Sequence, residues 1–300
     1  MKTIFIDCNA QLGAVWQRVY RPDDPPVSIN TTPFEKSELR RVIGDHAIAI
    51  DDHSYMPTEP VRQCRSLKHI VFLGTGAESY MDVPELEALG VKVHTIKGYG
   101  NIAVAEHTIA LMLACCRDLA RMDRGIRAEA WQPREGMQVL GKTLGIVGLG
   151  GIGAEVARIG KGLGMEVIAW NRTPRDAPVP LVELETLLQT SDVVSLNLVL
   201  NDGTRGFLDA ARIARMKPGA ILVNTARGAL VEEAALIDAL RSGHIRHAGL
   251  DVFHSEPLKA DHPLARLENV TLSAHAAFRT LEASVTLLRR AIDIVRSIVG

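Results

Sequence analysis

Short apolar runs separated by helical periodicity fill the chain from residue 143 onward. The runs are rich in β-branched residues, and each is about as long as one buried strand. They lie at 144–147, 167–170, 193–196, 221–224, 249–252 and 270–273. Between them lie amphipathic stretches such as 152–163, where Ile152, Val156 and Ile159 share one helix face. Strands that alternate with helices predict a parallel, doubly wound sheet.

The first hundred residues repeat this alternation on a smaller scale. Apolar runs predict strands at 3–6, 47–50, 70–73 and 91–94, and helical patterns lie at 35–43, 57–65 and 82–89. No glycine-rich phosphate loop interrupts this half. The fold class is therefore α/β, with two doubly wound parallel-sheet domains of which the first is the smaller.

Two further helical patterns differ from the rest. Residues 101–125 read as one long helix that is apolar on nearly all sides, as expected of a helix buried on several faces. We expect it to pack inside the protein and against a second copy of the chain, which predicts a homodimer through this region. Residues 281–299 form an amphipathic helix that we expect to return to the first domain.

Composition narrows the class of protein. A chain of 300 residues with 47% apolar content is long enough for two domains with their own cores. The net charge of −1 argues against a nucleic-acid partner, and no apolar stretch approaches the roughly 20 residues that span a bilayer. The four cysteines have neither metal nor disulfide spacing, so we expect a cytoplasmic protein. Residues 51–53, Asp-Asp-His, are a poor metal site because neighbouring strand residues point to opposite faces, and we expect no metal.

A complete G-x-G-x-x-G pattern, Gly148-Leu149-Gly150-Gly151-Ile152-Gly153, follows the run 143–147 and opens the next helix. In this setting Gly148 allows a tight turn, Gly150 lets the backbone approach a pyrophosphate, and Gly153 lets helix and strand pack closely. The helix start then offers free N–H groups to the phosphates. The pattern predicts a dinucleotide cofactor.

The end of the next strand bears on which dinucleotide is bound. An NAD site usually has an acid there, but this chain has Asn171, Arg172 and Thr173. Without that carboxylate, Arg172 can pair with a ribose 2′-phosphate, assisted by Thr173 and Arg175. NADP(H) is therefore favoured. NAD(H) stays possible if Arg172 is only a solvated loop residue.

Three later segments and the glycine loop together carry a family resemblance. Residues 224–228 (Asn-Thr-Ala-Arg-Gly), 249–257 and 269–275, with Val104-Ala105-Glu106-His107-Thr108, resemble the D-isomer specific 2-hydroxyacid dehydrogenases of glyoxylate/hydroxypyruvate reductase type. The resemblance implies a Rossmann coenzyme domain over 98–277. It also implies a flavodoxin-like substrate domain over 1–97, completed by 278–300.

The chemistry of 2-oxo acid reduction suits three residues in these segments. A proton must reach the carbonyl oxygen as hydride reaches the carbon, and histidine, here His275, is the side chain most often used for such a proton transfer. Glu256 can hydrogen-bond the other ring nitrogen, fix the tautomer and favour the protonated ring. Arg227 can bind the substrate carboxylate and polarise the carbonyl.

The resemblance assigns further contacts. Thr75, Gly76 and Ala77 resemble the loop whose N–H groups receive the substrate carboxylate, although such a turn is also common between a strand and a helix. The remaining implied positions lie near the substrate or cofactor. Among them are Asn101 on the substrate side and, on the cofactor side, Thr108, Leu198, Thr225, Ala226, Asp251 and His275 with the loop residues Gly148, Gly150, Gly151, Ile152 and Gly153.

The leading hypothesis is an NADP(H)-favouring reductase of glyoxylate- or hydroxypyruvate-type acids. Departures from the family pattern at 77–82, Val199, Ala274 and 278–279 leave the substrate open, and Arg279 or residues 53–55 are candidates to contact its far end. Phosphoglycerate or a bulkier oxo acid is the alternative substrate. A non-catalytic nucleotide sensor that binds a protein partner is the alternative class, and the intact Arg227, Glu256 and His275 argue against it.

Overall fold

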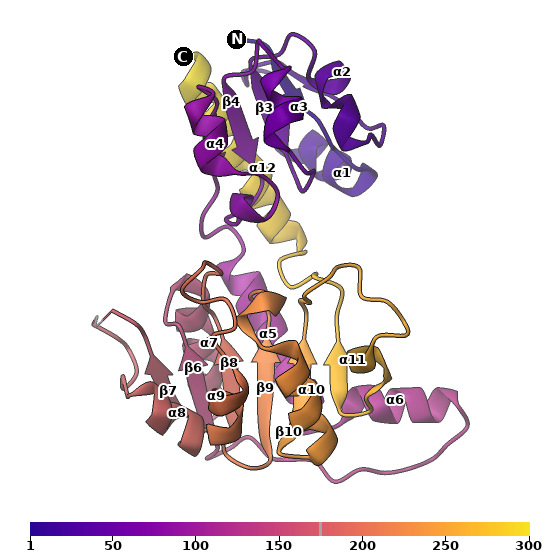
Figure 1. The fold of residues 1–300 in the computed structure, drawn as a ribbon, viewed down its shortest axis with the longest axis vertical. Helices are drawn as coiled ribbons and strands as arrows, with labels where there is room; N and C mark the ends of the chain where they lie inside the picture. Colours follow the sequence, from indigo (N-terminus) through magenta and orange to yellow (C-terminus); the bar gives the residue numbers. More distant parts are fainter. Residues whose placement is uncertain (174–175) are drawn as a thin grey trace. The chain divides into compact units, whose positions relative to one another are not determined.

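The computed structural model describes residues 1–173 and 176–300. It divides into two compact units, Met1–Gly100 with Arg279–Gly300, and Asn101–Phe278 (Figure 1). The boundaries expected from the sequence were 97/98 and 277/278. Arg175, which we expected to assist at a 2′-phosphate, lies outside the described residues.

The first unit contains a five-stranded parallel sheet in the order β2-β1-β3-β4-β5. Its strands are β1 Thr3–Phe5, β2 Val27–Ile29, β3 Ile48–Asp51, β4 His69–Phe72 and β5 Lys92–Thr95. This is the flavodoxin-like order, in which the chain reverses direction between β1 and β3. Strand β2 was not predicted, because a three-residue edge strand that is mostly exposed has too weak a pattern.

Helices cover both faces of this sheet. One face is covered by α1 (Ala10–Val19) and the C-terminal helix α12 (Leu281–Val299), seen in yellow beside the indigo segments in Figure 1. The other carries α2 (Leu39–Ile43), α3 (Thr58–Arg62) and α4 (Val83–Ala88), with 3₁₀ turns at Lys36–Glu38 and Ala77–Ser79. Helix α1 was missed from the sequence. Its apolar face buries Trp16 among α12 side chains that are distant in sequence.

A buried ion cluster ties α12 to the loop after α1. The Asp24 carboxylate is fully buried and accepts two hydrogen bonds of 2.7 Å from the Arg289 guanidinium. Arg296 donates a third at 2.5 Å. The Arg289 hydrogen bonds hold the pKa of Asp24 well below its usual range. The last helix is therefore fastened to the first unit by charge as well as by apolar packing.

The second unit is built on a six-stranded parallel sheet in the order β11-β10-β9-β8-β6-β7. Its strands are β6 Thr143–Val147, β7 Glu166–Trp170, β8 Val193–Leu196, β9 Ala220–Asn224, β10 Ile245–Leu250 and β11 Val270–Leu272. A single parallel bridge between Ala169 and Leu181 extends the sheet beyond β7. With that bridge counted as a third strand, the order becomes 3-2-1-4-5-6-7, which is Rossmann topology. The predicted fold class is confirmed.

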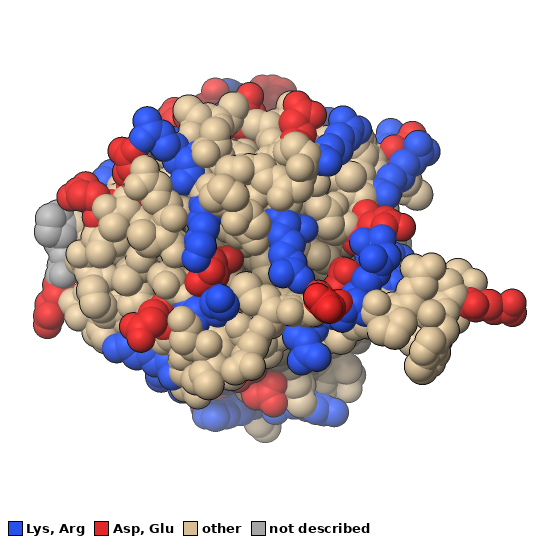
Figure 2. Space-filling model, turned by 90° about the horizontal axis from the view of Figure 1, so that it is seen from below, with Lys and Arg blue, Asp and Glu red and all other residues tan. Residues whose placement is uncertain are grey.

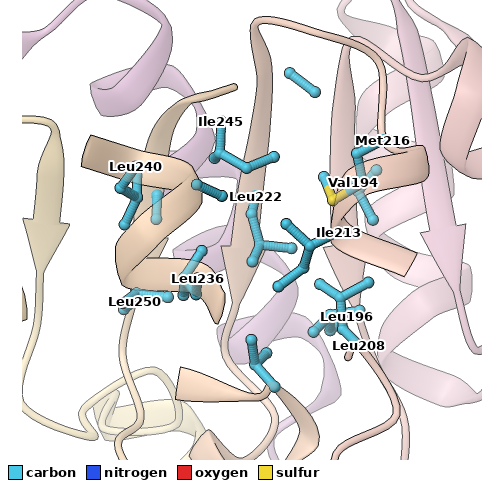
Figure 3. Packing of buried hydrophobic residues seen from close by; sticks show 14 of the residues in the cluster. Val194, Leu196, Leu208, Ile213, Met216, Leu222, Leu236, Leu240, Ile245 and Leu250 are labelled. Atoms are coloured by element: carbon cyan, nitrogen blue, oxygen red, sulfur yellow. The ribbon is translucent and has the colours of Figure 1, made fainter. Parts of the chain in front are cut away.

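Two apolar layers sandwich this second sheet. Helices α8 (Leu184–Thr190), α9 (Ala210–Arg215) and α10 (Glu233–Ser242) cover one face, and Figure 3 shows side chains such as Ile213 and Leu236 directed at Leu222 on β9. Helices α5 (Asn101–Cys116) and α7 (Gly151–Gly162) cover the other. Two short turns, Gly228–Leu230 (3₁₀) and α11 (Pro263–Arg266), follow β9 and precede β11.

The prediction of one continuous helix over 101–125 was wrong. The structure has two helices, α5 and α6 (Leu119–Arg127), separated at Asp118, whose φ is +53°. Aspartate tolerates this left-handed conformation better than most residues, and Arg117-Asp118 interrupts the apolar pattern. Helix α5 is largely buried, whereas α6 buries none of its residues. None of the helices in the described ranges is long and apolar enough to cross a membrane.

Candidate functional site

The site residues of the second unit gather because its strands are parallel. The carboxyl ends of parallel strands meet at one edge of the sheet, and the loops there form the binding crevice of such folds. Each of the six strands of the second sheet places at least one predicted residue at this edge. The glycine loop follows β6, Asn171 follows β7, Leu198 follows β8, Thr225–Arg227 follow β9, Asp251 and Glu256 follow β10, and His275 follows β11.

The glycine loop has the geometry that its pattern predicts. Gly148 has a φ of +97°, and a side chain there would come within 2.8 Å of the Asn197 carbonyl oxygen on the neighbouring loop. A side chain at Gly153 would collide with the Gly148 carbonyl, so helix α7 approaches the strand end closely. Gly150 faces open space instead. The start of α7 is therefore accessible to a phosphate group.

Two predicted residues pack around this loop. Leu198 lies 2.9 Å from where a Gly148 side chain would begin, so it covers the turn. Asn101, at the start of α5, lies against Gly151, where any side chain would collide with the Asn101 amide. The sequence placed Asn101 near the substrate. Its position beside the glycine loop was not foreseen.

Asn171 links the end of β7 to the glycine loop. Its Oδ1 accepts a hydrogen bond of 3.2 Å from the Leu149 N–H, and its Nδ2 donates to the Thr173 carbonyl at 2.7 Å. The Arg172 and Thr173 residues are exposed. Where a ribose-binding acid would stand, the chain thus has a neutral amide used for structure and an arginine at the surface.

Thr108 and Thr225 meet inside the unit, although they are 117 residues apart. The Thr108 hydroxyl donates to the Val104 carbonyl at 2.7 Å, and its Oγ1 lies 2.7 Å from that of Thr225. Because a hydroxyl carries one proton, Thr225 must be the donor in the second bond. Ala226 follows, with its N–H bound by the Asn224 side chain at 3.0 Å. Both threonine hydroxyls are buried, so their contact fastens the β9 loop to α5.

Arg227 lies in a loop that is pressed against the segment after β10. A side chain at Gly228 would collide with the Phe253 backbone, so only glycine permits this approach. Asn224 Nδ2 donates to the Arg227 carbonyl at 2.9 Å, and Arg227 Nη1 donates to the Ala226 carbonyl at 2.7 Å. The guanidinium is close enough to Glu256 to help lower the pKa of that carboxyl group.

Glu256 and His275 form a close pair. His275 Nδ1 lies 2.6 Å from Glu256 Oε2, and the Phe253 N–H donates to Glu256 Oε1 at 2.9 Å. Burial acts to raise the pKa of Glu256, but these hydrogen bonds and the nearby charges outweigh it, so the pKa lies below its usual value. Glu256 therefore remains ionised and accepts the Nδ1 proton. The imidazole is about one-quarter exposed, and its Nε2 is the nitrogen that can exchange a proton with a substrate.

The backbone of His275 adopts a left-handed conformation, with φ of +47°. Asp251 binds the segment around it. The Asp251 carbonyl accepts the His275 N–H at 2.8 Å, and its fully buried carboxylate accepts the N–H groups of Ala276 and Ala277 at 2.9 and 3.0 Å. The cofactor contact expected of Asp251 stays a prediction. Its anchoring role was missed, as was Ser273, which donates to the same carboxylate at 2.6 Å.

In the first unit, Thr75, Gly76 and Ala77 lie just after β4. Within the described ranges, the N–H groups of these three residues donate to no protein acceptor. Nearby aromatic side chains include His53 and Tyr80, whose rings lie 5.1 Å apart, and Tyr55, 5.6 Å from Tyr80. In the part of the chain that the structure describes, no three His, Cys, Asp or Glu residues are grouped to hold a metal ion.

The fold and this edge define a dinucleotide-dependent oxidoreductase of α/β type, and comparison with known proteins gives the family. The sequence profile of the "D-isomer specific 2-hydroxyacid dehydrogenase, NAD binding domain" matches residues 109–277. The chain therefore belongs to the D-isomer specific 2-hydroxyacid dehydrogenases, and it is an NAD(P)-dependent oxidoreductase.

Individual relatives differ in their named substrates. A hydroxypyruvate reductase of Thermotoga maritima is 35% identical over 86% of this chain and 86% of its own length. A D-3-phosphoglycerate dehydrogenase of Archaeoglobus fulgidus is 34% identical over 87% of this chain, which spans only 51% of that relative. The solved structure of an acyclic imino acid reductase in complex with NADPH and D-Arg is 26% identical, with a TM-score of 0.86 over 100% of this chain and 97% of that one.

Proposed function

We propose that the protein reduces small 2-oxo acids of the glyoxylate or hydroxypyruvate type to the D-2-hydroxy acids, with NADP(H) favoured over NAD(H). The observation that carries this proposal is the 2.6 Å pair of His275 and Glu256, at the same sheet edge as Arg227 and the glycine loop. A carboxylate that holds one ring nitrogen of a histidine, while the other ring nitrogen is left to a substrate, is an arrangement suited to acid–base catalysis.

Residues of the second unit have different roles in the proposed reaction. The nicotinamide, when bound, supplies or accepts the hydride. His275 donates its Nε2 proton to the oxygen of the oxo group, and Glu256 stabilises the ring by holding Nδ1–H. Arg227 binds the substrate carboxylate and polarises the carbonyl. In the reverse direction, neutral His275 accepts the hydroxyl proton through the same nitrogen.

The cofactor preference rests on the end of β7. The Asn171 side chain is neutral and hydrogen-bonds to Leu149 and Thr173, so no carboxylate at this position repels a 2′-phosphate. Arg172 is exposed and can pair with that phosphate. The structural relative in complex with NADPH is in keeping with this preference. The proposed cofactor site also includes the other residues named above, among them Thr108, Ile152, Thr173, Leu198, Thr225, Ala226 and Asp251.

On the substrate side, the loop of Thr75, Gly76 and Ala77 in the first unit is proposed to bind the substrate carboxylate through its N–H groups. The aromatic rings of Tyr55 and Tyr80 near that loop favour an uncharged substrate side chain over a phosphate. A reductase of hydroxypyruvate type is in keeping with the Thermotoga relative, and the phosphoglycerate alternative rests on the Archaeoglobus relative.

We also propose a cytoplasmic homodimer formed through the 101–125 region. Ile102 and Leu119 within this region, and Ile126 just after it, are each more than half exposed, which is unusual for large apolar side chains unless a partner covers them. Figure 2 shows acidic and basic side chains interspersed on the face it draws, with no extended basic patch among its described residues. Such a face suits a small-molecule enzyme better than a nucleic-acid-binding protein. Light scattering of the wild type and of Leu119→Glu tests the dimer.

Initial rates of NADPH and NADH oxidation test the proposed reaction. Purified protein is supplied with glyoxylate, hydroxypyruvate, pyruvate, phenylpyruvate or phosphohydroxypyruvate. We expect the highest kcat/KM with glyoxylate or hydroxypyruvate and an NADPH advantage that Arg172→Gln lowers about 10-fold, as for loss of one charge-assisted contact. Turnover confined to the phosphorylated acid would replace the proposed substrate. Cofactor binding without any turnover would favour the sensor.

A further inference from the structure

Helix α5 contacts three of the loops that carry site residues in the second unit. From its N-terminal half, Asn101 lies against the glycine loop and Thr108 is bound by Thr225 after β9. Between them, His107 reaches Ser273, two residues before His275. The first two contacts involve positions that the sequence had already singled out, but His107 has been given no individual role.

A directed chain of hydrogen bonds starts at His107. Its Nε2 lies 2.8 Å from Ser273 Oγ, and Ser273 Oγ lies 2.6 Å from Asp251 Oδ1. The serine has a single hydroxyl proton, which it donates to the carboxylate. Ser273 must therefore accept from His107, whose proton is on Nε2. The order of donation is His107 to Ser273 to Asp251.

The buried end of this chain fixes the backbone of His275. The N–H groups of His275, Ala276 and Ala277 all point at Asp251, one at its carbonyl and two at its carboxylate. Successive N–H groups can converge on an anion in a turn or next to a left-handed residue. His275 is the left-handed residue that precedes the two N–H groups bound to the carboxylate. A left-handed backbone conformation is unfavourable for a histidine. It persists because the Asp251 contacts hold it.

We propose that His107 is a positioning residue for the acid–base histidine. Its hydrogen bond through Ser273 fixes the Asp251 carboxylate, which holds the 275–277 backbone in the conformation that directs the His275 ring at Glu256. The inference rests on the proposed function of His275. His107 itself need not contact substrate or cofactor, because it acts through the loop.

Two substitutions at His107 test this role. His107→Phe removes the donor, and His107→Gln keeps an N–H donor on a side chain of similar reach. We expect His107→Phe to lower kcat about 10- to 100-fold, as for a small displacement of a reacting group, with KM changed less than about 2-fold. His107→Gln should recover most of kcat. Ser273→Ala, with little change in volume, should lower kcat as His107→Phe does.

The matched control is His262→Phe. His262 has nearly the same partial exposure as His107 and binds Glu233, and within the described residues it makes no hydrogen bond or ion pair to residues 273–277. Its kcat should equal that of the wild type. If His107→Phe and His262→Phe leave kcat equally unchanged, or if His107→Gln fails to recover it, the positioning role is wrong.

A second measurement does not need turnover. The short His275–Glu256 hydrogen bond should give a far-downfield proton resonance in the cofactor-free protein, lost in His275→Asn and in His107→Phe but kept in His262→Phe. Loss of the signal in His107→Phe supports the positioning role even if no acid is reduced, in which case only the proposed reaction fails. Retention of the signal in His107→Phe would overturn the inference.

Discussion

The two units have related parallel sheets, but they differ at the N-terminus of the helix that follows the first strand in each unit. In the first unit, β1 leads into α1, whose N-terminus is capped by Asn9 accepting the Leu12 N–H at 2.9 Å. In the second, β6 leads into α7, whose N-cap residue is Gly150, which has no capping side chain and faces open space. The Leu12 N–H at the start of α1 is therefore bound within the protein, whereas the start of α7 is open to an anion.

The residues just before these helices reinforce the difference. Asp7 follows β1 and uses its carboxylate internally, accepting the N–H groups of Asp52, His53 and Ser54 at 2.8 to 3.1 Å. A negative charge at that position disfavours a phosphate. Gly148 at the matching point of the second unit brings no charge. Related topology thus gives a nucleotide site in one unit only, because of a few side chains at the strand end.

The largest expected effect comes from removing the acid–base group, which only the second unit provides. His275→Asn keeps a residue type that tolerates left-handed backbone, so the fold should be retained. We expect kcat to fall about 10²- to 10⁴-fold, with a much smaller change in cofactor affinity. Steady-state rates and cofactor titration measure the two effects. A loss of less than 10-fold would assign the proton to another group.

The next effect concerns stability of the first unit, which needs residues 279–300 to be complete. Asp24→Asn leaves the Arg289 charge without its buried partner, and we expect a loss of about 3–5 kcal/mol in the free energy of unfolding. Asp23→Asn is the matched control, because Asp23 is exposed and pairs only at the surface with Arg296. It should cost less than about 1 kcal/mol. Equal losses in urea unfolding would contradict a role for the buried cluster.

A third substitution gives the start of α7 in the second unit a capping side chain, as α1 has in the first unit. Gly150→Asp places an acidic cap at the start of α7, where the backbone is extended and the space is open. The helix should be kept or stabilised, while NADPH affinity should fall roughly 30- to 100-fold, or about 2–3 kcal/mol, because the carboxylate opposes the pyrophosphate. Gly150→Asn separates shape from charge and should weaken binding less. Unchanged affinity in Gly150→Asp would contradict the proposed phosphate position.

The smallest effect is a pH dependence located in the second unit. Burial lowers the pKa of His247 to about 4, against the opposing charge of Asp118. An unfolded histidine titrates near 6.5, so between about pH 6.5 and 4 the unfolded state binds more protons and stability falls as the pH falls. His247→Gln should remove about 2 kcal/mol of the change between pH 7 and pH 5. Urea unfolding at both pH values measures it, and an unaltered slope would show that His247 is not the group responsible.

Much of the second unit was predictable because its signals are local. Buried parallel strands are continuous apolar runs, and the glycine spacing at 148–153 has a direct steric meaning at the end of β6. In the first unit, strand β2 and helix α1 were missed, since their packing partners are distant in sequence. The α5–α6 break was missed because the polar pair Arg117-Asp118 is too short an interruption of the apolar pattern to reveal the left-handed backbone at Asp118.

The sequence by itself determined the fold class, the family and the residues suited to the chemistry, because those depend on periodicity, glycine positions and residue type. Only the tertiary structure decided which groups touch. In the structure, Asp251 anchors the loop that carries His275, Asn101 lies against Gly151, and His107 donates a hydrogen bond to Ser273. These contacts join residues up to 166 positions apart, and a long-range hydrogen bond has no local pattern from which to infer it.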